Sequence, residues 1–231
     1  MAKHLDLEEQ EQLADIKHFW NEYGNLITWV VIAVFGSIAA WNGWQYWQRT
    51  QSVQAAAMYD EVERAAQAGD VDHLERALSD MKDKFGRTTY AQQAALLAAT
   101  VLFDKGKPDA AKGALGWVAD KASDEGYQAV ARLRLAGILA DAKAYDEALK
   151  QLSGDFPREF EPLAADRRGD VYNLQGKKAE AKAEYLKAYK AFEQGSEYRR
   201  LVEVKLSSLG ADPRPLAPAD AATAASGAAK S

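Results

Sequence analysis

The chain has 231 residues and a formal net charge of −5, a length that suits one or two compact domains. This mildly acidic balance argues against a nucleic-acid-binding protein, because such proteins usually carry a basic patch or stripe. The sequence contains no cysteine, which excludes disulfides, thiolate zinc sites and a cysteine nucleophile.

Residues 25–48 form an apolar stretch without a charged side chain. A helix rises about 1.5 Å per residue, so a helix of this length crosses a hydrocarbon core of about 30 Å. Trp29 lies near one end and Trp41, Trp44 and Trp47 lie near the other, which fits the preference of aromatic rings for the headgroup level. We therefore predict a single transmembrane helix over 25–48.

Two other interpretations of this stretch are a cleaved signal peptide and a buried core helix. A signal peptide needs a basic start and a short apolar core, whereas the segment 1–24 is acidic and contains only two lysines, Lys3 and Lys17. A weak cleavage motif at 37–39 falls inside the apolar run. The orientation stays open at this point, because basic residues flank both ends of the stretch and long domains translocate regardless of charge.

Four helix–turn–helix patterns follow the apolar stretch. Their turn residues are Gly69, Gly106, Lys143 and Gly176, at separations of 37, 37 and 33 residues. Tetratricopeptide repeats have a period of 34 residues and two helices per unit, and their hairpins stack into a solenoid with a continuous core. Small and large residues alternate in the last unit as close helix packing requires: Gly169, Tyr172, Ala181, Tyr185 and Ala188. An irregular helical bundle with coincidental spacing is the alternative.

These patterns predict an all-α protein with four parts. The segment 1–24 is acidic, 25–48 is the transmembrane helix, and 49–210 is a tetratricopeptide-like solenoid of about four repeats with a capping helix. The segment 211–231 is rich in alanine and proline and has one large apolar residue, Leu216, so we predict that it is a disordered tail.

No motif in the chain indicates catalysis, a cofactor or a metal. The three histidines, His4, His18 and His73, do not form a ligand pair at helical spacing, and there is no glycine-rich phosphate loop or nucleophile elbow. We therefore predict no catalytic, cofactor-binding or metal-binding residue. An enzyme whose site is assembled from scattered carboxylates, such as Asp166 and Asp170, is the remote alternative.

The inward positions of the first helix of each repeat predict a protein-binding groove. Apolar and acidic residues alternate there, and such a mixture suits extended or partly unfolded polypeptide. The groove residues are Tyr59, Glu63, Leu96, Phe103, Asp166, Asp170 and Asn173. Packing between helices is an equally good interpretation of the same residues.

Small residues recur on one face of the apolar stretch, at Ala33, Gly36, Ala40 and Gly43. In lipid, helices associate through close backbone approach, which small residues permit, so we predict a packing face for a partner helix. The alternative is that glycine and alanine are simply common in membrane helices.

Five segments of the chain resemble the YfgM family when taken in order. They are LADIKHFWNEYGN, GWQYWQ, AVARLRLAGILADAKAYDEAL, AADRRGDVYNLQGKKAEAKAEY and VEVKLSSL, and the resemblance covers roughly residues 9 to 210. No single motif is diagnostic, because the specificity lies in their order.

The resemblance implies a function that the residues alone do not give. Members of this family are ancillary subunits of the SecYEG translocon in the inner membrane of Gram-negative bacteria, without catalytic residues. The resemblance implies a cytoplasmic N-terminus, a periplasmic repeat domain, association with the chaperone PpiD, and transfer of unfolded exported proteins to periplasmic chaperones. The alternative is an anchored scaffold for envelope assembly or stress-response regulation.

Overall fold

The computed structural model describes residues 7–211, except for the side chains of residues 7–12 and 14–16. The predicted disordered tail therefore lies outside the described residues apart from Ala211, which is buried. The first six residues of the acidic segment also lie outside them.

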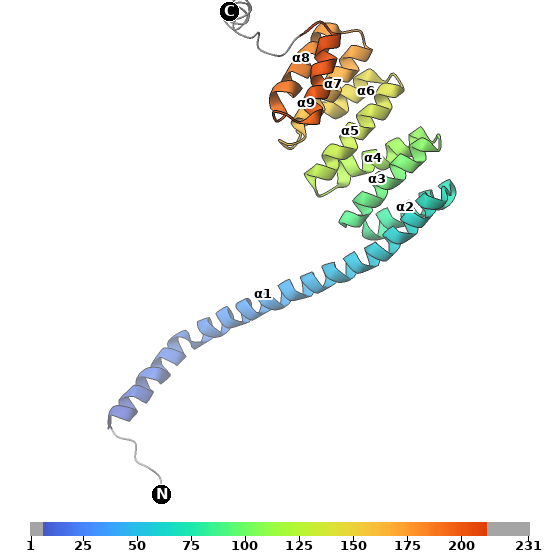
Figure 1. Cartoon of the computed structure of the whole chain (residues 1–231). Coiled ribbons are helices and arrows are strands. Elements are labelled where there is room, and N and C mark those ends of the chain that lie inside the picture. The colour runs from blue at the N-terminus through green and yellow to red at the C-terminus, as the bar shows by residue number, and fades with distance from the viewer. Residues whose placement is uncertain (1–6, 212–231) are drawn as a thin grey trace, which may run out of the picture. The chain divides into compact units, whose positions relative to one another are not determined.

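The described residues form nine helices and no strand, which confirms the all-α prediction. The helices, shown in Figure 1, are α1 (Leu7–Ala68), α2 (Val71–Phe85), α3 (Thr89–Asp104), α4 (Pro108–Lys121), α5 (Glu125–Asp141), α6 (Tyr145–Leu152), α7 (Glu161–Leu174), α8 (Lys178–Ala191) and α9 (Glu197–Ser208). The chain divides into two compact units, Met1–Gln54 and Ala55–Ser231.

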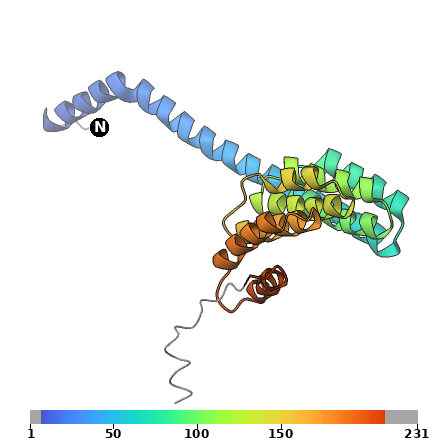
Figure 2. The same cartoon turned by 90° about the horizontal axis from the view of Figure 1, so that it is seen from above.

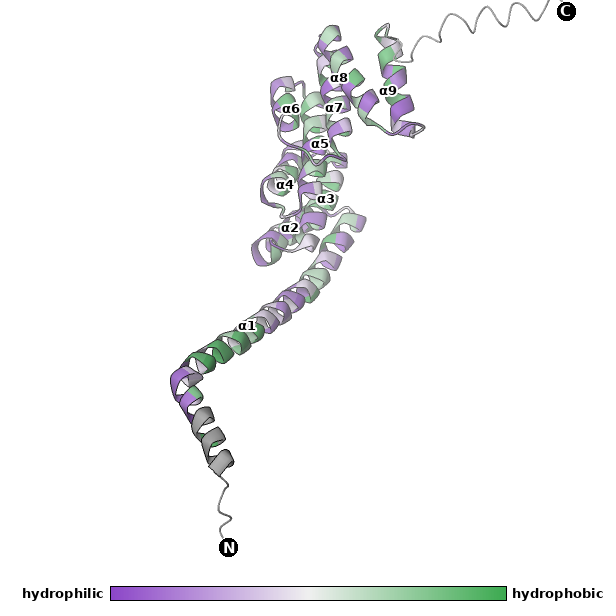
Figure 3. Cartoon of the chain, turned by 90° about the vertical axis from the view of Figure 1, so that its left-hand side faces the viewer, coloured by the Kyte–Doolittle hydropathy of each residue, from purple (hydrophilic) through white to green (hydrophobic). Residues whose placement is uncertain are grey.

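The first unit contains most of α1, and its apolar band is visible in Figure 3. Among the described residues, α1 alone is long and apolar enough to cross a membrane, with a mean hydropathy of 1.7 in its most apolar window. Large side chains along this band are exposed, including Trp29 at 65% and Phe35 at 68%. A core helix would bury such side chains, so the core-helix interpretation is wrong and α1 is a candidate membrane span.

The second unit is a stack of helical hairpins. Figures 1 and 2 show the helices following one another in chain order from α2 at one end of the unit to α8 and α9 at the other. The last turns of α1 pair with α2, and α3 with α4, α5 with α6 and α7 with α8 complete the four predicted hairpins. Buried residues, many of them alanine, form the core between the layers.

The four predicted turn residues share one backbone conformation. Gly69, Gly106, Lys143 and Gly176 all have positive φ, between 60° and 75°, and Lys143 is the one non-glycine residue with positive φ in the described part of the chain. Each turn repeats the pair of backbone hydrogen bonds of a Schellman motif; at Gly106, Gly106 N donates to Phe103 O at 2.9 Å and Lys107 N to Leu102 O at 2.8 Å. The turns therefore set a common register for the first helix of each hairpin.

A fifth turn of the same kind ends α9. Gly210 lies 34 residues after Gly176, has a φ of 72°, and is followed by Ala211 N donating to Leu206 O at 3.0 Å. By this register, α9 is the first helix of a fifth repeat. Long charged residues replace small ones on it: Glu203 stands in the position of Gly169 and Arg199 in that of Ala165. The guanidinium of Arg199 lies 4.2 Å from the ring centroid of Tyr189, so this side chain packs α9 against α8.

Candidate functional site

The turn register shows how the predicted groove residues relate to one another. Tyr59, Leu96 and Asp166 each lie ten residues before their turn, Glu63 and Asp170 lie six before, and Phe103 and Asn173 lie three before. The predicted residues thus occupy three equivalent positions on the first helices of the hairpins. Their surroundings differ from repeat to repeat.

In the first two repeats, the position ten before the turn is used for packing. Leu96 is 9% exposed and belongs to the core. Tyr59 is half-buried, and its ring lies 6.0 Å from the ring of Tyr90. Burial, with the charges of Glu63 and Asp60, raises the pKa of Tyr59. Glu63 is itself half-buried beside it.

In the fourth repeat, the two acidic residues are engaged by the capping helix. Lys205 Nζ of α9 lies 2.8 Å from both carboxylate oxygens of Asp166 and 2.7 Å from Oδ1 of Asp170. Tyr185 donates its hydroxyl to the same Asp170 oxygen at 2.8 Å, and Arg167 approaches Oδ2 at 3.6 Å. The pair that the sequence predicts as groove lining therefore ties α7 to α8 and α9.

Burial dominates the electrostatics of this cluster. Asp166 is 8% exposed, and burial raises its pKa even though the Lys205 ammonium opposes the shift. Burial and the hydrogen bond to Asp170 also raise the pKa of Tyr185. The Lys205 ammonium is thus the charge that opposes protonation of the buried Asp166, and it also pairs with Asp170.

A groove stays open between the second and third hairpins. It is a cavity of about 260 Å³, lined mainly by α3 and α5, and Arg167 of α7 reaches its edge. Phe103 lies in it with 39% of its surface exposed, whereas the predicted Asn173 is exposed outside this lining. We call this cavity the α3–α5 groove. Its other principal lining residues are Thr100, Leu133, Arg134 and Gly137.

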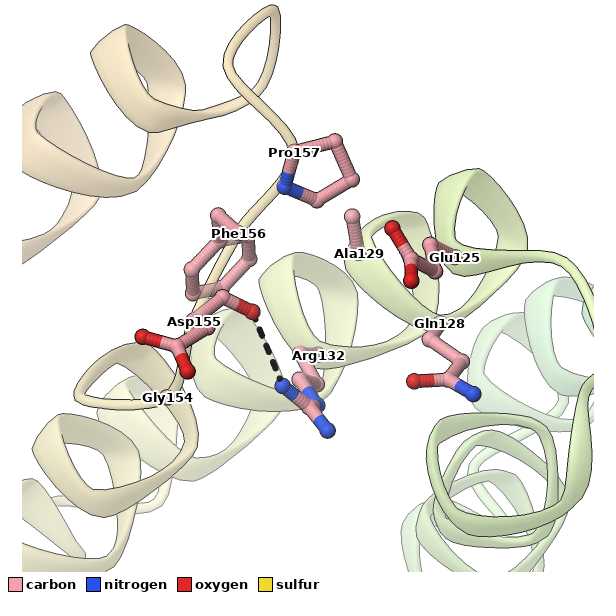
Figure 4. Close-up of a pocket in the computed structure, with 8 residues that line it drawn as sticks. All are labelled: Glu125, Gln128, Ala129, Arg132, Gly154, Asp155, Phe156 and Pro157. Atoms are coloured by element: carbon pink, nitrogen blue, oxygen red, sulfur yellow. Dashed lines mark hydrogen bonds between the residues drawn. The ribbon is translucent and has the colours of Figure 1, made fainter.

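A second cavity, of about 380 Å³, results from the shortness of α6 (Figure 4). This helix has 8 residues, whereas α4 and α8 have 14 each, so a loop takes the place of its last turns beside α5. Arg132 donates to the carbonyl of Asp155 in this loop at 3.3 Å, and Gln128 donates to the carbonyl of Ala122 at 2.7 Å. These polar groups hold the loop and the preceding turn in place.

The described residues contain no group of three or more histidine, aspartate or glutamate side chains placed to hold a metal ion. The predicted packing face on α1 is exposed, and a Cβ added at Gly36 or Gly43 would meet no atom within 4 Å. Ala33 and Ala40 are exposed on the same helix, and the Ser37 hydroxyl donates a hydrogen bond to the carbonyl of Ala33 at 2.7 Å. A neighbouring helix could therefore approach the α1 backbone here.

Sequence reasoning missed the residues that make the α3–α5 groove open. Gly137 lies six residues before its turn, where Glu63 and Asp170 stand in other repeats, and Arg134 and Arg167 each lie nine before theirs. The spacing of the turns was visible in the sequence. An alignment of the repeats by their turn residues would have identified these three residues as different from their equivalents. The prediction included Asp166 and Asp170 instead, and Lys205 of α9 pairs with both.

The fold and the groove define a class of protein: a tetratricopeptide-like solenoid that follows an apolar N-terminal helix. A family model described as a tetratricopeptide repeat-like domain matches residues 17–211. The chain is also similar to three bacterial proteins that are each named ancillary SecYEG translocon subunit. The one from Neisseria gonorrhoeae (strain ATCC 700825 / FA 1090) is 35% identical over 211 residues, covering 90% of this chain and 100% of the relative.

The other two relatives match nearly as widely. The one from Aggregatibacter actinomycetemcomitans is 27% identical, covering 88% of this chain and 98% of the relative, and the one from Escherichia coli (strain K12) is 29% identical, covering 76% and 84%. The chain belongs to the family of ancillary SecYEG translocon subunits, which confirms the resemblance to the YfgM family.

Proposed function

We propose that this protein is a non-enzymatic subunit that associates with the SecYEG translocon and binds exported polypeptide as it leaves the membrane. The observation that carries the proposal is the match to the gonococcal relative, which runs over the whole of that protein and includes both units of this chain. An end-to-end match supports a shared assembly more strongly than a match of the repeats alone, because tetratricopeptide folds serve many functions.

The proposal places α1 across the bacterial inner membrane once, with the N-terminus in the cytoplasm and the repeat unit in the periplasm. The uncharged stretch 25–48 and its exposed apolar side chains support an uncleaved anchor. Protease added to spheroplasts is expected to digest the repeat unit and to spare the N-terminal segment. Protection of the repeat unit until the membrane is lysed would reverse this topology.

Two surfaces have separate roles in the proposal. The face with Gly36 and Ala40 packs against a membrane helix of the translocon or of PpiD, and the α3–α5 groove holds unfolded exported protein before it passes to periplasmic chaperones. The relatives' name as translocon subunits supports a binding role over the alternative of a carboxylate enzyme. Asp166 and Asp170 also form ion pairs with Lys205 that join α7 to α9, so these carboxylates have a structural role.

The association is tested by purifying the tagged full-length chain from membranes in mild detergent. We expect the SecYEG subunits and PpiD to co-purify, and a variant with Gly36→Leu and Ala40→Leu to insert normally while recovering less of both. A chain in which an unrelated transmembrane helix replaces residues 25–48 controls for non-specific membrane contacts. Recovery of neither partner with the wild-type chain would overturn the proposed association.

A further inference from the structure

The α3–α5 groove contains a hollow that one residue creates. Gly137 lies on α5 six residues before its turn, and the equivalent residues are Glu63, Thr100, Asp170 and Val204. Each of these has a side chain, so the third hairpin alone leaves the position empty. A Cβ built on Gly137 would meet no atom within 4 Å.

The hollow has the size and lining for a side chain. Its volume of about 260 Å³ is below the range of roughly 300–1,000 Å³ that is typical of small-molecule pockets. Phe103, Leu133 and Ile138 give it apolar walls. The exposure of Phe103 at 39% shows that the wall is accessible from solvent. An aromatic or large aliphatic side chain of a bound segment fits these features.

The charges at the edge of the hollow come from two neighbouring repeats. Arg134 and Arg167 both lie nine residues before their turns, where the other first helices carry Asp60, Leu97 and Leu201. Arg134 donates to Leu96 O at 3.4 Å and to Thr100 Oγ1 at 3.3 Å, and makes no ion pair within the described part of the chain. A guanidinium carries five donors, so both arginines retain donors for a ligand carboxylate.

Acidic residues lie near both arginines: Asp104 and Asp141 line the same groove, and Oδ2 of Asp170 lies 3.6 Å from Arg167. Asp166 and Asp170 are held by Lys205, and Asp104 and Asp141 are the last residues of α3 and α5, near the turns. The hollow therefore has an arginine side and an aspartate end. Beside Arg134, which bonds neutral acceptors, the groove is complementary to a carboxylate of a bound segment and unfavourable to a lysine.

We infer that the α3–α5 groove selects extended polypeptide segments in which a large apolar side chain enters the hollow over Gly137 and an adjacent acidic residue pairs with Arg134 or Arg167. This rests on the proposed function, because it specifies which polypeptides the groove binds. A groove lined by Asp166 and Asp170 would instead favour basic segments.

The test uses the full-length chain in neutral phosphatidylcholine nanodiscs and fluorescent glycine/serine peptides with a central Glu-Phe-Glu, Lys-Phe-Lys or Glu-Ala-Glu block. Fluorescence anisotropy gives each Kd. We expect Glu-Phe-Glu to bind most tightly, and Glu-Ala-Glu to bind roughly 10- to 100-fold more weakly, because the free energy of burying a phenylalanine side chain is lost. Lys-Phe-Lys is expected to bind about tenfold more weakly.

Variants separate the hollow from its charges. Gly137→Leu fills the hollow and is expected to weaken Glu-Phe-Glu binding about tenfold or more. Gly113→Leu is the matched control, because Gly113 is also a helical glycine with no atom within 4 Å of an added Cβ, but it lies on α4 outside the groove. The double variant Arg134→Gln/Arg167→Gln is expected to lose the preference for the Glu peptide over the Lys peptide.

The outcomes distinguish the inference from the proposed function. Binding of the phenylalanine peptides that Gly137→Leu leaves unchanged would overturn the inference and leave polypeptide binding to another surface. A preference for Lys-Phe-Lys would also overturn it. Absence of binding by every peptide would instead contradict the proposed role of the groove, while co-purification with the translocon would still test the association.

Discussion

The third and fourth hairpins use equivalent positions in opposite ways. At six residues before the turn, α5 has Gly137 and α7 has Asp170; at ten before, α5 has Leu133 and α7 has Asp166. The α5 positions line an open groove, whereas Lys205 of α9 reaches both acidic residues of α7. The same helix position is therefore a binding surface or a structural contact, depending on whether another helix covers it.

The difference shows how the solenoid ends. The acidic residues of α7 pair with Lys205 of α9, and Arg199 of α9 packs over the ring of Tyr189 on α8. In the middle of the stack no helix covers the equivalent positions, so Gly137 and Phe103 line an open groove. The predictions below test this contrast between a closed end and an open middle.

The largest expected effect is loss of the charge that holds the closed end. Lys205→Met leaves Asp166 and Asp170 as neighbouring carboxylates without their ammonium, and we expect the Ala55–Ser231 unit to lose about 2–3 kcal/mol of unfolding free energy at pH 7. Urea denaturation measures the change. Lys190→Met on the exposed side of α8 is the control, and an equal loss in both variants would mean that Lys205 contributes no special contact.

The same variant should depend on pH in a defined direction. Burial already raises the pKa of Asp166, and removal of Lys205 removes the hydrogen bond and charge that oppose this shift. A carboxyl group whose pKa is raised by folding stabilises the fold most below its unfolded pKa of about 3.9, and this stabilisation is lost as the pH rises through the folded pKa. We therefore expect the deficit of Lys205→Met relative to wild type to shrink from pH 7 towards pH 4. A deficit that grows on acidification would contradict this account of the cluster.

A smaller loss is expected where α7 and α8 approach closely. A Cβ added at Gly169 would lie 2.5 Å from the ring of Tyr185, which is 2% exposed and cannot move freely. Gly169→Ala should therefore overpack this contact and lower the unfolding free energy by about 1–3 kcal/mol. Thermal denaturation of the repeat unit gives the measurement. An unchanged melting temperature would show that α7 and α8 can separate without cost.

The sequence was sufficient for the repeats because their turns depend on local chemistry. Gly69, Gly106 and Gly176 suit positive φ, and the register alone identified Lys143, which lacks that advantage. The groove could not be predicted in the same way. Whether Asp166 lines a surface or pairs with Lys205 depends on a contact 39 residues away in the chain, and no local pattern specifies that pairing.

The smallest expected effect is a gain in unfolding free energy, and it compares a glycine of the open middle with one of the closed end. Gly137 and Gly169 are both helical glycines on the first helices of adjacent hairpins, but an added Cβ at Gly137 meets nothing within 4 Å. Alanine is favoured over glycine inside a helix by roughly 0.5–1 kcal/mol, so Gly137→Ala should stabilise the repeat unit by about that amount. The same substitution thus has opposite signs at the two positions in thermal denaturation. A loss of stability at Gly137 would mean that the hollow is closed in solution, and that the open middle of the stack is a feature the folded protein does not keep.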